Sequence, residues 1–295
     1  MNEMFYKWIV NLSRKWGMWV FHTYRSIVAF GFFILFPLRV AVSVRFYRVL
    51  YPNKNLRYHL WCSWRQYLNF TTIFLDRFLF QESGDISYTS KGWEYFEDAL
   101  KQKTGGIILM SHMGNWEVAA HLFKEKKGDI PLLLYMGAKH KEQIERIQKE
   151  SLYQRGIKIV ALDQDSDSPF DIIEGVNFLK SGGFVSITGD VIWRKKQRTV
   201  SVQFLDHIVN LPETPHVLSL LSGAPLFILF AFRTNDRQYH ISVTRHRPIR
   251  SASRSDRKEA VRRSIQEYAS LLEKAVREHP LQWYHFRPFL GNRLK

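Results

Sequence analysis

The residues best suited to chemistry are a histidine and a glutamate, His112 and Glu117, in the segment Ser111–Glu117. An imidazole oriented by a carboxylate can act as a general base, because the carboxylate fixes the tautomer and stabilises the imidazolium. On one regular helix, residues five apart lie roughly 140° apart around the axis and do not pair closely. The pair therefore needs a different local structure.

A turn between a strand and a helix supplies that structure. The short apolar run Ile107–Met110 is typical of a buried strand, residues 113–115 of a turn, and the stretch from Trp116 of a helix. His112 then lies at the carboxyl end of a strand, where open α/β sheets collect ligands. Glu117 can approach the imidazole from the first turn of the helix. A surface or core histidine beside a helix is the alternative interpretation.

A second polar segment follows another predicted strand, residues 183–188. It places Asp190 on the same sheet edge as His112, with the basic residues Arg194, Lys195 and Arg198 close behind. These cations are candidates for holding phosphates of a donor or acceptor, and Asp190 is a candidate substrate-binding residue. A solvated basic loop is the alternative.

The elements that must position these residues alternate between strands and helices, which predicts an α/β fold with a mixed sheet flanked by helices. Strands are expected at 107–110, 131–136, 157–161, 183–188, 226–232 and 239–243, and helices at 93–102, 116–125, 139–154, 170–180, 214–222 and about 255–279. Residues 1–82 are expected to form a helical, membrane-associated region, and residues 83–295 the α/β domain.

The N-terminal region contains an uncharged run, Ser26–Leu38, bracketed by Arg25 and Arg39. At 13 residues it is shorter than the roughly 20 residues of a membrane-spanning helix. An interfacial helix, a single span and a buried core helix all remain open, and the flanking Arg and Trp residues favour the interfacial arrangement.

The composition adds a strong positive field, because 43 Lys and Arg oppose 27 Asp and Glu, a net charge of +16. Such a field attracts anionic lipid, phosphorylated substrates or nucleic acid. Aromatic residues make up 15% of the chain and concentrate in its apolar N-terminal part, which favours a membrane surface over nucleic acid. Cys62 is the sole cysteine, so cysteine metal clusters are excluded, and no histidine–carboxylate spacing predicts a metal site.

The whole string Ser111–Glu117 resembles the His-x4-Asp/Glu motif of glycerophosphate and lysophospholipid acyltransferases. Its Gly-Asn-Trp-Glu form is similar to the late lipid A (lauroyl/myristoyl) acyltransferase branch, and His279–Phe286 resembles the His-Pro-x-Gln-Trp-aromatic ending of that branch. The resemblance covers most of the chain. It implies an α/β fold with an N-terminal membrane-associated helix.

The resemblance also implies the reaction. A fatty acyl group moves from a thioester, on acyl carrier protein or coenzyme A, to a hydroxyl of a lipid or glycolipid such as a lipid A precursor. His112 is then the base, Glu117 its partner, and Gly114 and Asn115 shape the turn at the substrate site. The thioester is a co-substrate and no cofactor is expected.

The expected location is the cytoplasmic face of the cell inner membrane, with monotopic or single-pass attachment to an anionic lipid surface. The acceptor stays open between a lipid A precursor, another glycolipid, a lysophospholipid and a lipoamino acid. One reason is that residues 134–140 lack an arginine that lipid A branch members often carry there. A non-catalytic basic protein that binds membranes or nucleic acid is the alternative from another class.

Overall fold

The computed structural model describes residues 12, 15–83, 87–116, 118, 131–138, 158–163, 170–194, 196–246, 248–291 and 293. The chain divides into two compact units. The first comprises Met1–Asp85 with Pro280–Pro288, and the second comprises Ile86–His279 with Phe289–Lys295. The tail segment 280–288 therefore groups with the N-terminal helices, although the sequence boundary at 82/83 assigned it to the α/β domain.

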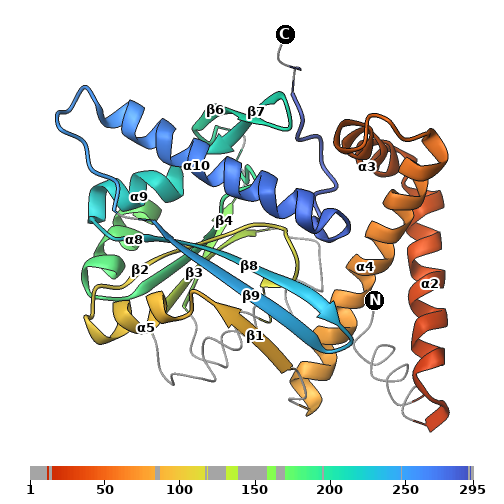
Figure 1. The fold of residues 1–295 in the computed structure, drawn as a ribbon. Coiled ribbons are helices and arrows are strands. Elements are labelled where there is room, and N and C mark those ends of the chain that lie inside the picture. Colours follow the sequence, from red (N-terminus) through yellow and green to blue (C-terminus); the bar gives the residue numbers. More distant parts are fainter. Residues whose placement is uncertain are drawn as a thin grey trace. The chain divides into compact units, whose positions relative to one another are not determined.

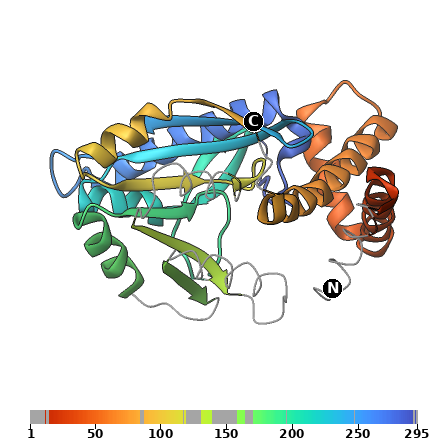
Figure 2. The ribbon, with the colours of Figure 1, turned by 90° about the horizontal axis from the view of Figure 1, so that it is seen from below.

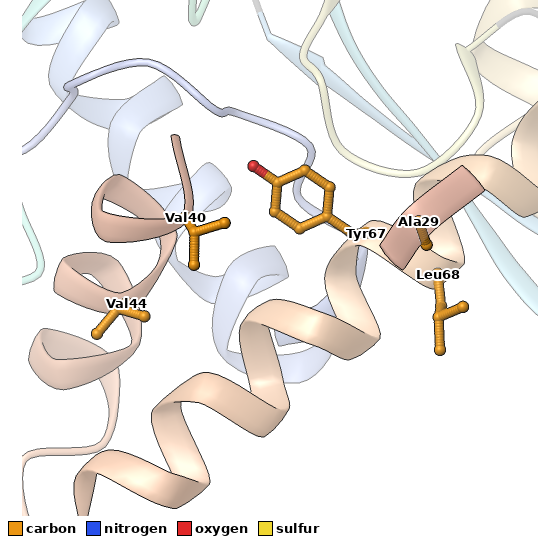
Figure 3. Close-up of a cluster of buried hydrophobic side chains, with 5 residues drawn as sticks. All are labelled: Ala29, Val40, Val44, Tyr67 and Leu68. Carbon is orange, nitrogen blue, oxygen red and sulfur yellow. The ribbon is translucent and has the colours of Figure 1, made fainter. Parts of the chain in front are cut away.

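The first unit is helical, with α2 (Met18–Leu35), α3 (Pro37–Leu50), α4 (Leu56–Ser83) and the short 3-10 helix η1 (Pro280–Gln282) (Figure 1). Its core gathers Ala29, Val40, Val44, Tyr67 and Leu68 from three helices (Figure 3). The tail joins this core through aromatic contacts, because the Phe286 ring stacks on Tyr67 with centroids 4.6 Å apart.

The uncharged run Ser26–Leu38 is broken, which the sequence interpretation did not anticipate. Pro37 lacks a backbone N–H and fixes φ, so it ends α2 and starts α3 as the first residue of a new helix. The two helices differ in direction by 95°. Within the described residues no single helix has the length and hydropathy of a membrane span, although Trp19–Leu35 and Pro37–Leu50 reach them jointly as a bent pair.

The second unit confirms the predicted α/β fold. Its elements are β1 (Ser87–Lys91), α5 (Glu94–Lys101), β2 (Gly106–Met110), β3 (Leu132–Ala138), β4 (Lys158–Asp163), α8 (Phe170–Lys180), β5 (Phe184–Thr188), β6 (Thr199–Phe204), β7 (His207–Pro212), α9 (Thr214–Ser222), β8 (Leu226–Asn235), β9 (Gln238–His246) and α10 (Arg257–Glu278).

Seven strands form one mixed sheet in the order β1-β9-β8-β2-β5-β3-β4, and only β8 and β9 pair in antiparallel fashion within it. Helices flank this sheet (Figures 1 and 2). Strands β6 and β7 form a separate two-stranded sheet. Strands β2 and β5 are buried along most of their length, as parallel strands covered on both faces usually are.

The structure contains three strands that the sequence interpretation did not predict: β1, β6 and β7. The predicted helices at 116–125 and 139–154 lie outside the described residues, apart from Trp116 and Val118 at the start of the first.

Candidate active site

Two neighbouring parallel strands bring His112 and Asp190 together. Strands β2 and β5 pair with Met110 opposite Thr188, and each candidate residue follows its own strand by two positions. Equal offsets from paired strand ends put both side chains at the same point of the carboxyl edge. The expectation that Asp190 shares the edge of His112 is confirmed.

The carboxylate of Asp190 binds His112 twice. Its Oδ2 accepts the backbone N–H of His112 at 2.8 Å, and its Oδ1 lies 2.9 Å from the imidazole Nδ1. The Asp190 side chain is fully buried, whereas 30% of the His112 side chain is exposed. The carboxylate is therefore held inside the protein while the imidazole reaches the surface.

This geometry sets the protonation pattern of the imidazole. A carboxylate at Nδ1 accepts the Nδ1 hydrogen, so the neutral ring carries its lone pair on Nε2. When Nε2 takes a proton, the buried negative charge stabilises the resulting imidazolium. Such an arrangement can perform general-base chemistry on a group that approaches Nε2.

The turn after His112 is attached to strand β8. Gly114 has φ +68°, and a Cβ there would lie 2.0 Å from the carbonyl oxygen of Ala231. The backbone N–H of Asn115 donates to the same oxygen at 2.8 Å. The Asn115 side-chain amide donates to the Tyr239 hydroxyl at 3.2 Å, and Asn115 is buried. Gly114 and Asn115 thus shape the turn, as the family resemblance implies, and Asn115 does so from inside the protein. A substrate-binding role for these two residues stays a prediction.

Tyr268 of α10 supports the floor of the site. Its hydroxyl donates to the Met110 carbonyl at 3.2 Å, and the Gly189 N–H donates to the same carbonyl at 2.8 Å. Burial raises the pKa of Tyr268 well above its usual value, and the nearby Asp190 charge raises it further, against a lowering hydrogen bond with Ser111. Tyr268 is therefore a neutral hydrogen-bonding group beside a buried carboxylate.

The loop after β5 forms a wall next to the imidazole. The Trp193 ring centroid lies 6.3 Å from that of His112, and its indole N–H donates to Thr188 Oγ1 at 2.9 Å. The Gln197 side-chain oxygen accepts the backbone N–H groups of Trp193 and Arg194 at 2.8 and 3.3 Å. These bonds fix the position of Trp193, a residue that sequence reasoning did not select.

The predicted basic residues have different surroundings. Arg194 pairs with Asp171 in the first turn of α8, and both side chains are largely buried, so this ion pair ties the loop to a helix. Arg198 is 87% exposed, with a guanidinium nitrogen 3.8 Å from a Glu213 carboxylate oxygen. Lys195 lies outside the described residues. A substrate-binding role for these three residues stays a prediction.

Glu117 also lies outside the described residues, so its predicted pairing with His112 stays a prediction. The sequence interpretation assigned the orientation of the His112 imidazole to Glu117. In the structure, the carboxylate that contacts Nδ1 and can orient the ring belongs to Asp190. Sequence reasoning put Asp190 at the correct edge but did not pair it with the imidazole. The available signal was that His112 and Asp190 each follow a predicted strand by two residues. Because Met110 pairs with Thr188 in the sheet, these equal offsets bring the two side chains into contact.

Comparison with known proteins agrees with the motif. Residues 64–291 match the family model for bacterial lipid A biosynthesis acyltransferases. A search of curated proteins found no significant match. The matched range includes the site from His112 to Arg198 and the tail through Phe286. With more than half of its length matched, the chain belongs to the bacterial lipid A biosynthesis acyltransferase family.

Proposed function

We propose that the protein transfers a fatty acyl group from an acyl thioester to a hydroxyl of a membrane lipid or glycolipid. Membership of an acyltransferase family supports acyl transfer to a lipid. The observation that carries the proposal within this chain is the contact of His112 Nδ1 with the buried Asp190 carboxylate, 2.9 Å long.

In the proposed reaction, His112 Nε2 removes the proton of the acceptor hydroxyl as its oxygen attacks the thioester carbonyl carbon. The new carbon–oxygen bond forms, the carbon–sulfur bond breaks, and the thiol leaves with a proton returned by the imidazolium. The acceptor is itself the nucleophile, so no acyl-enzyme intermediate is needed. By accepting the Nδ1 hydrogen, Asp190 selects the neutral tautomer whose lone pair is on Nε2, and its charge stabilises the imidazolium that forms during the attack.

The proposed donor is acyl carrier protein or coenzyme A charged with a fatty acid, and the proposed acceptor is a lipid A precursor. Both donors carry phosphate, as does the acceptor. Exposed Arg198 is suited to an anionic group, and Lys195 and Arg194 are further candidates from sequence. We place the reaction at the cytoplasmic face of the inner membrane, where an anionic surface meets a chain of charge +16.

A second candidate function is a non-catalytic basic protein that binds membranes or nucleic acid, which the net charge of +16 favours. That function does not need His112. It also provides no reason for a buried carboxylate to hold the imidazole.

Mass spectrometry of reaction products tests the proposal. Purified protein is supplied with acyl carrier protein or coenzyme A thioesters and, separately, with a lipid A precursor, a lysophospholipid and a lipoamino acid. The proposal expects one acceptor to gain the mass of one acyl group while one equivalent of free thiol appears. Hydrolysis of the thioester without any acylated acceptor, or no turnover with any pair, would contradict it.

A further inference from the structure

The outer side of helix α2 is mostly apolar and exposed, and the Thr23 hydroxyl on it donates to the Trp19 carbonyl. Trp19, Ile27, Phe30 and Ile34 recur at helical spacing and are each more than half exposed. The opposite side of α2 packs on α4, where the Phe33 ring lies 5.7 Å from the Trp64 ring. One side of this helix therefore belongs to the helical unit, and the other presents large apolar side chains to the surroundings.

The single charged residue in the sequence of α2 is turned inward. Arg25 donates to Thr72 Oγ1 on α4 at 2.9 Å. The outer side of α2 consequently has no Lys, Arg, Asp or Glu between Met18 and Leu35. An exposed surface of this kind marks an interaction site with an apolar partner.

The apolar surface continues through the bend. Leu35, Phe36 and Leu38 are 73%, 40% and 83% exposed. The charge changes immediately after them, since Arg39 follows and its guanidinium lies 5.2 Å from the Phe36 ring centroid. Arginine and aromatic side chains at the border of an apolar patch are typical of the membrane–water interface.

From Met4 to Leu75 the charged residues in the sequence around this surface are all basic. The sequence from Met4 to Leu75 contains ten lysines and arginines and no aspartate or glutamate. Arg39, Arg45, Arg48, Arg57 and Arg65 are exposed on α3 and α4. An apolar stripe bordered by exposed cations complements an anionic lipid surface, where each basic residue near the headgroups adds favourable energy.

The position of Arg65 decides the orientation. It follows Trp64, whose ring contacts both Phe30 and Phe33, so Arg65 lies at the same level along the helix pair as the apolar half of α2. If α2 and α4 stood along the membrane normal, Phe30 and Arg65 would lie at the same depth. Burying Phe30 in the hydrocarbon would then also bury the charge of Arg65, which is costly. If the pair lies in the membrane plane, one side is immersed while Arg65 stays among headgroups.

We infer that α2 lies in the plane of an anionic bilayer, with Trp19, Ile27, Phe30, Ile34 and the Leu35–Leu38 bend immersed in one leaflet and the α3 arginines among the headgroups. This rests on the proposed function only for the identity of the membrane. The depth expected for such an interfacial helix is about 5–10 Å below the headgroup boundary.

Site-specific fluorescence tests the orientation. Cys62 is buried, and burial raises the pKa of its thiol, so introduced cysteines in the full chain label selectively. An environment-sensitive dye is placed at Phe30→Cys, Arg65→Cys and, as a control on an exposed isoleucine of α8, Ile173→Cys. The vesicles combine phosphatidylglycerol with phosphatidylethanolamine and carry nitroxides at shallow or deep acyl positions.

The inference expects the dye at position 30 to be quenched more by shallow than by deep nitroxides. At positions 65 and 173 it should remain accessible to aqueous iodide. Strong quenching of both positions 30 and 65 by deep nitroxides would show a transverse helix pair and overturn the inference. Absence of any nitroxide quenching at position 30 would overturn it as well.

A binding measurement adds an unlabelled readout. Phe30→Glu should weaken sedimentation with the same vesicles by about tenfold or more, and Ile173→Glu should leave it within about twofold. Equal effects of the two substitutions would count against the α2 surface. None of these readouts requires acyl transfer, so a chain that binds as described but acylates nothing would refute the proposed reaction alone.

Discussion

At the scale of single residues, the site depends on which group holds the imidazole of His112. Asp190 binds both the backbone N–H and the Nδ1 of the same residue, so one buried side chain fixes the position and the tautomer together. A base with a fixed tautomer and an imidazolium-stabilising charge loses much of its power when that charge is removed.

The substitution Asp190→Asn tests this arrangement. An amide can still accept the His112 N–H, but it supplies no negative charge and can present its NH2 group to Nδ1, which favours the wrong tautomer. We expect kcat to fall by roughly 10²–10⁴-fold with a smaller change in KM. Thermal unfolding of the variant provides the folding control. A kcat within about threefold of the wild type, in a folded variant, would rule out the proposed contribution of Asp190.

The same assay applied to Glu117→Gln separates the two carboxylates. A loss confined to Asp190→Asn would assign the orienting function to Asp190, whereas a loss confined to Glu117→Gln would assign it to the residue that the motif suggests.

At the scale of elements, the site consists of two strand ends and the turns that follow them. The turn after β2 approaches β8 so closely that Gly114 has no room for a side chain, and its positive φ is strained for any other residue. The loop after β5 is held by Trp193, Gln197 and the Arg194–Asp171 ion pair. Element geometry therefore restricts substitution even where a side chain performs no chemistry.

Gly114→Ala should be strongly destabilising. The new Cβ would lie 2.0 Å from the Ala231 carbonyl oxygen, and backbone must move to relieve the contact. We expect a loss of about 2–4 kcal/mol of unfolding free energy, measured by denaturant titration. Gly223→Ala is a matched control, because Gly223 has φ +75° but no atom within 4 Å of its would-be Cβ. Its cost should be about 1 kcal/mol. Equal costs for the two variants would show that the close approach to β8 is not limiting.

Tyr268 predicts a pH dependence. Its folded-state pKa is raised, mainly by burial, so folding favours the protonated phenol. That stability is fully present below about pH 10, where unfolded tyrosine is also protonated, and is lost as the pH rises from there toward the folded pKa. Tyr268→Phe should therefore reduce the slope of stability against pH above about pH 10, measured by urea unfolding. Tyr95→Phe, at an exposed tyrosine of α5, should not. An unchanged slope in Tyr268→Phe would contradict the raised pKa.

At the scale of the whole molecule, hydrophobic periodicity predicts most of the fold, whereas the site also depends on the strand register. Buried parallel strands such as β2 and β5 show in the sequence as short apolar runs, and α10 shows as a long amphipathic repeat. The hairpin of β6 and β7 was missed because its turn residues, Leu205 and Asp206, both adopt positive φ without the usual Asn-Gly signal. Strand β1 was missed because it is mostly exposed and polar.

The sequence predicts that His112 and Asp190 lie at the same sheet edge, but it does not predict the hydrogen bond between them. Which strands are neighbours, and in what register, depends on packing over the whole sheet. The break at Pro37 has a clear local signal, because proline lacks a backbone N–H and is favoured at the first position of a helix, whereas the composition of the uncharged run around it carries no sign of a break. The tail after Pro280 joins the helical unit through aromatic contacts such as Phe286 with Tyr67, which no local pattern specifies.

The charge of the whole chain predicts how its membrane affinity responds to salt. Electrostatic attraction to anionic vesicles should weaken as NaCl rises from about 0.05 to 0.5 M, because the Debye length shortens severalfold. Burial of apolar side chains is not screened, so part of the binding should persist at the higher concentration. Vesicle sedimentation measures both components. Complete loss of binding at about 0.5 M NaCl would indicate purely electrostatic attachment, and binding to neutral vesicles of equal strength would exclude an electrostatic contribution.

The central claim is that His112 is the base of an acyl transfer reaction. Its most direct test is mass-spectrometric measurement of acylated lipid formed by the wild type and by His112→Ala, with matched folding verified by circular dichroism and equal binding to anionic vesicles. We predict product for the wild type and a loss of at least about 10³-fold for His112→Ala, since the variant has no group to accept the hydroxyl proton. Equal product formation by the two proteins would contradict the claim.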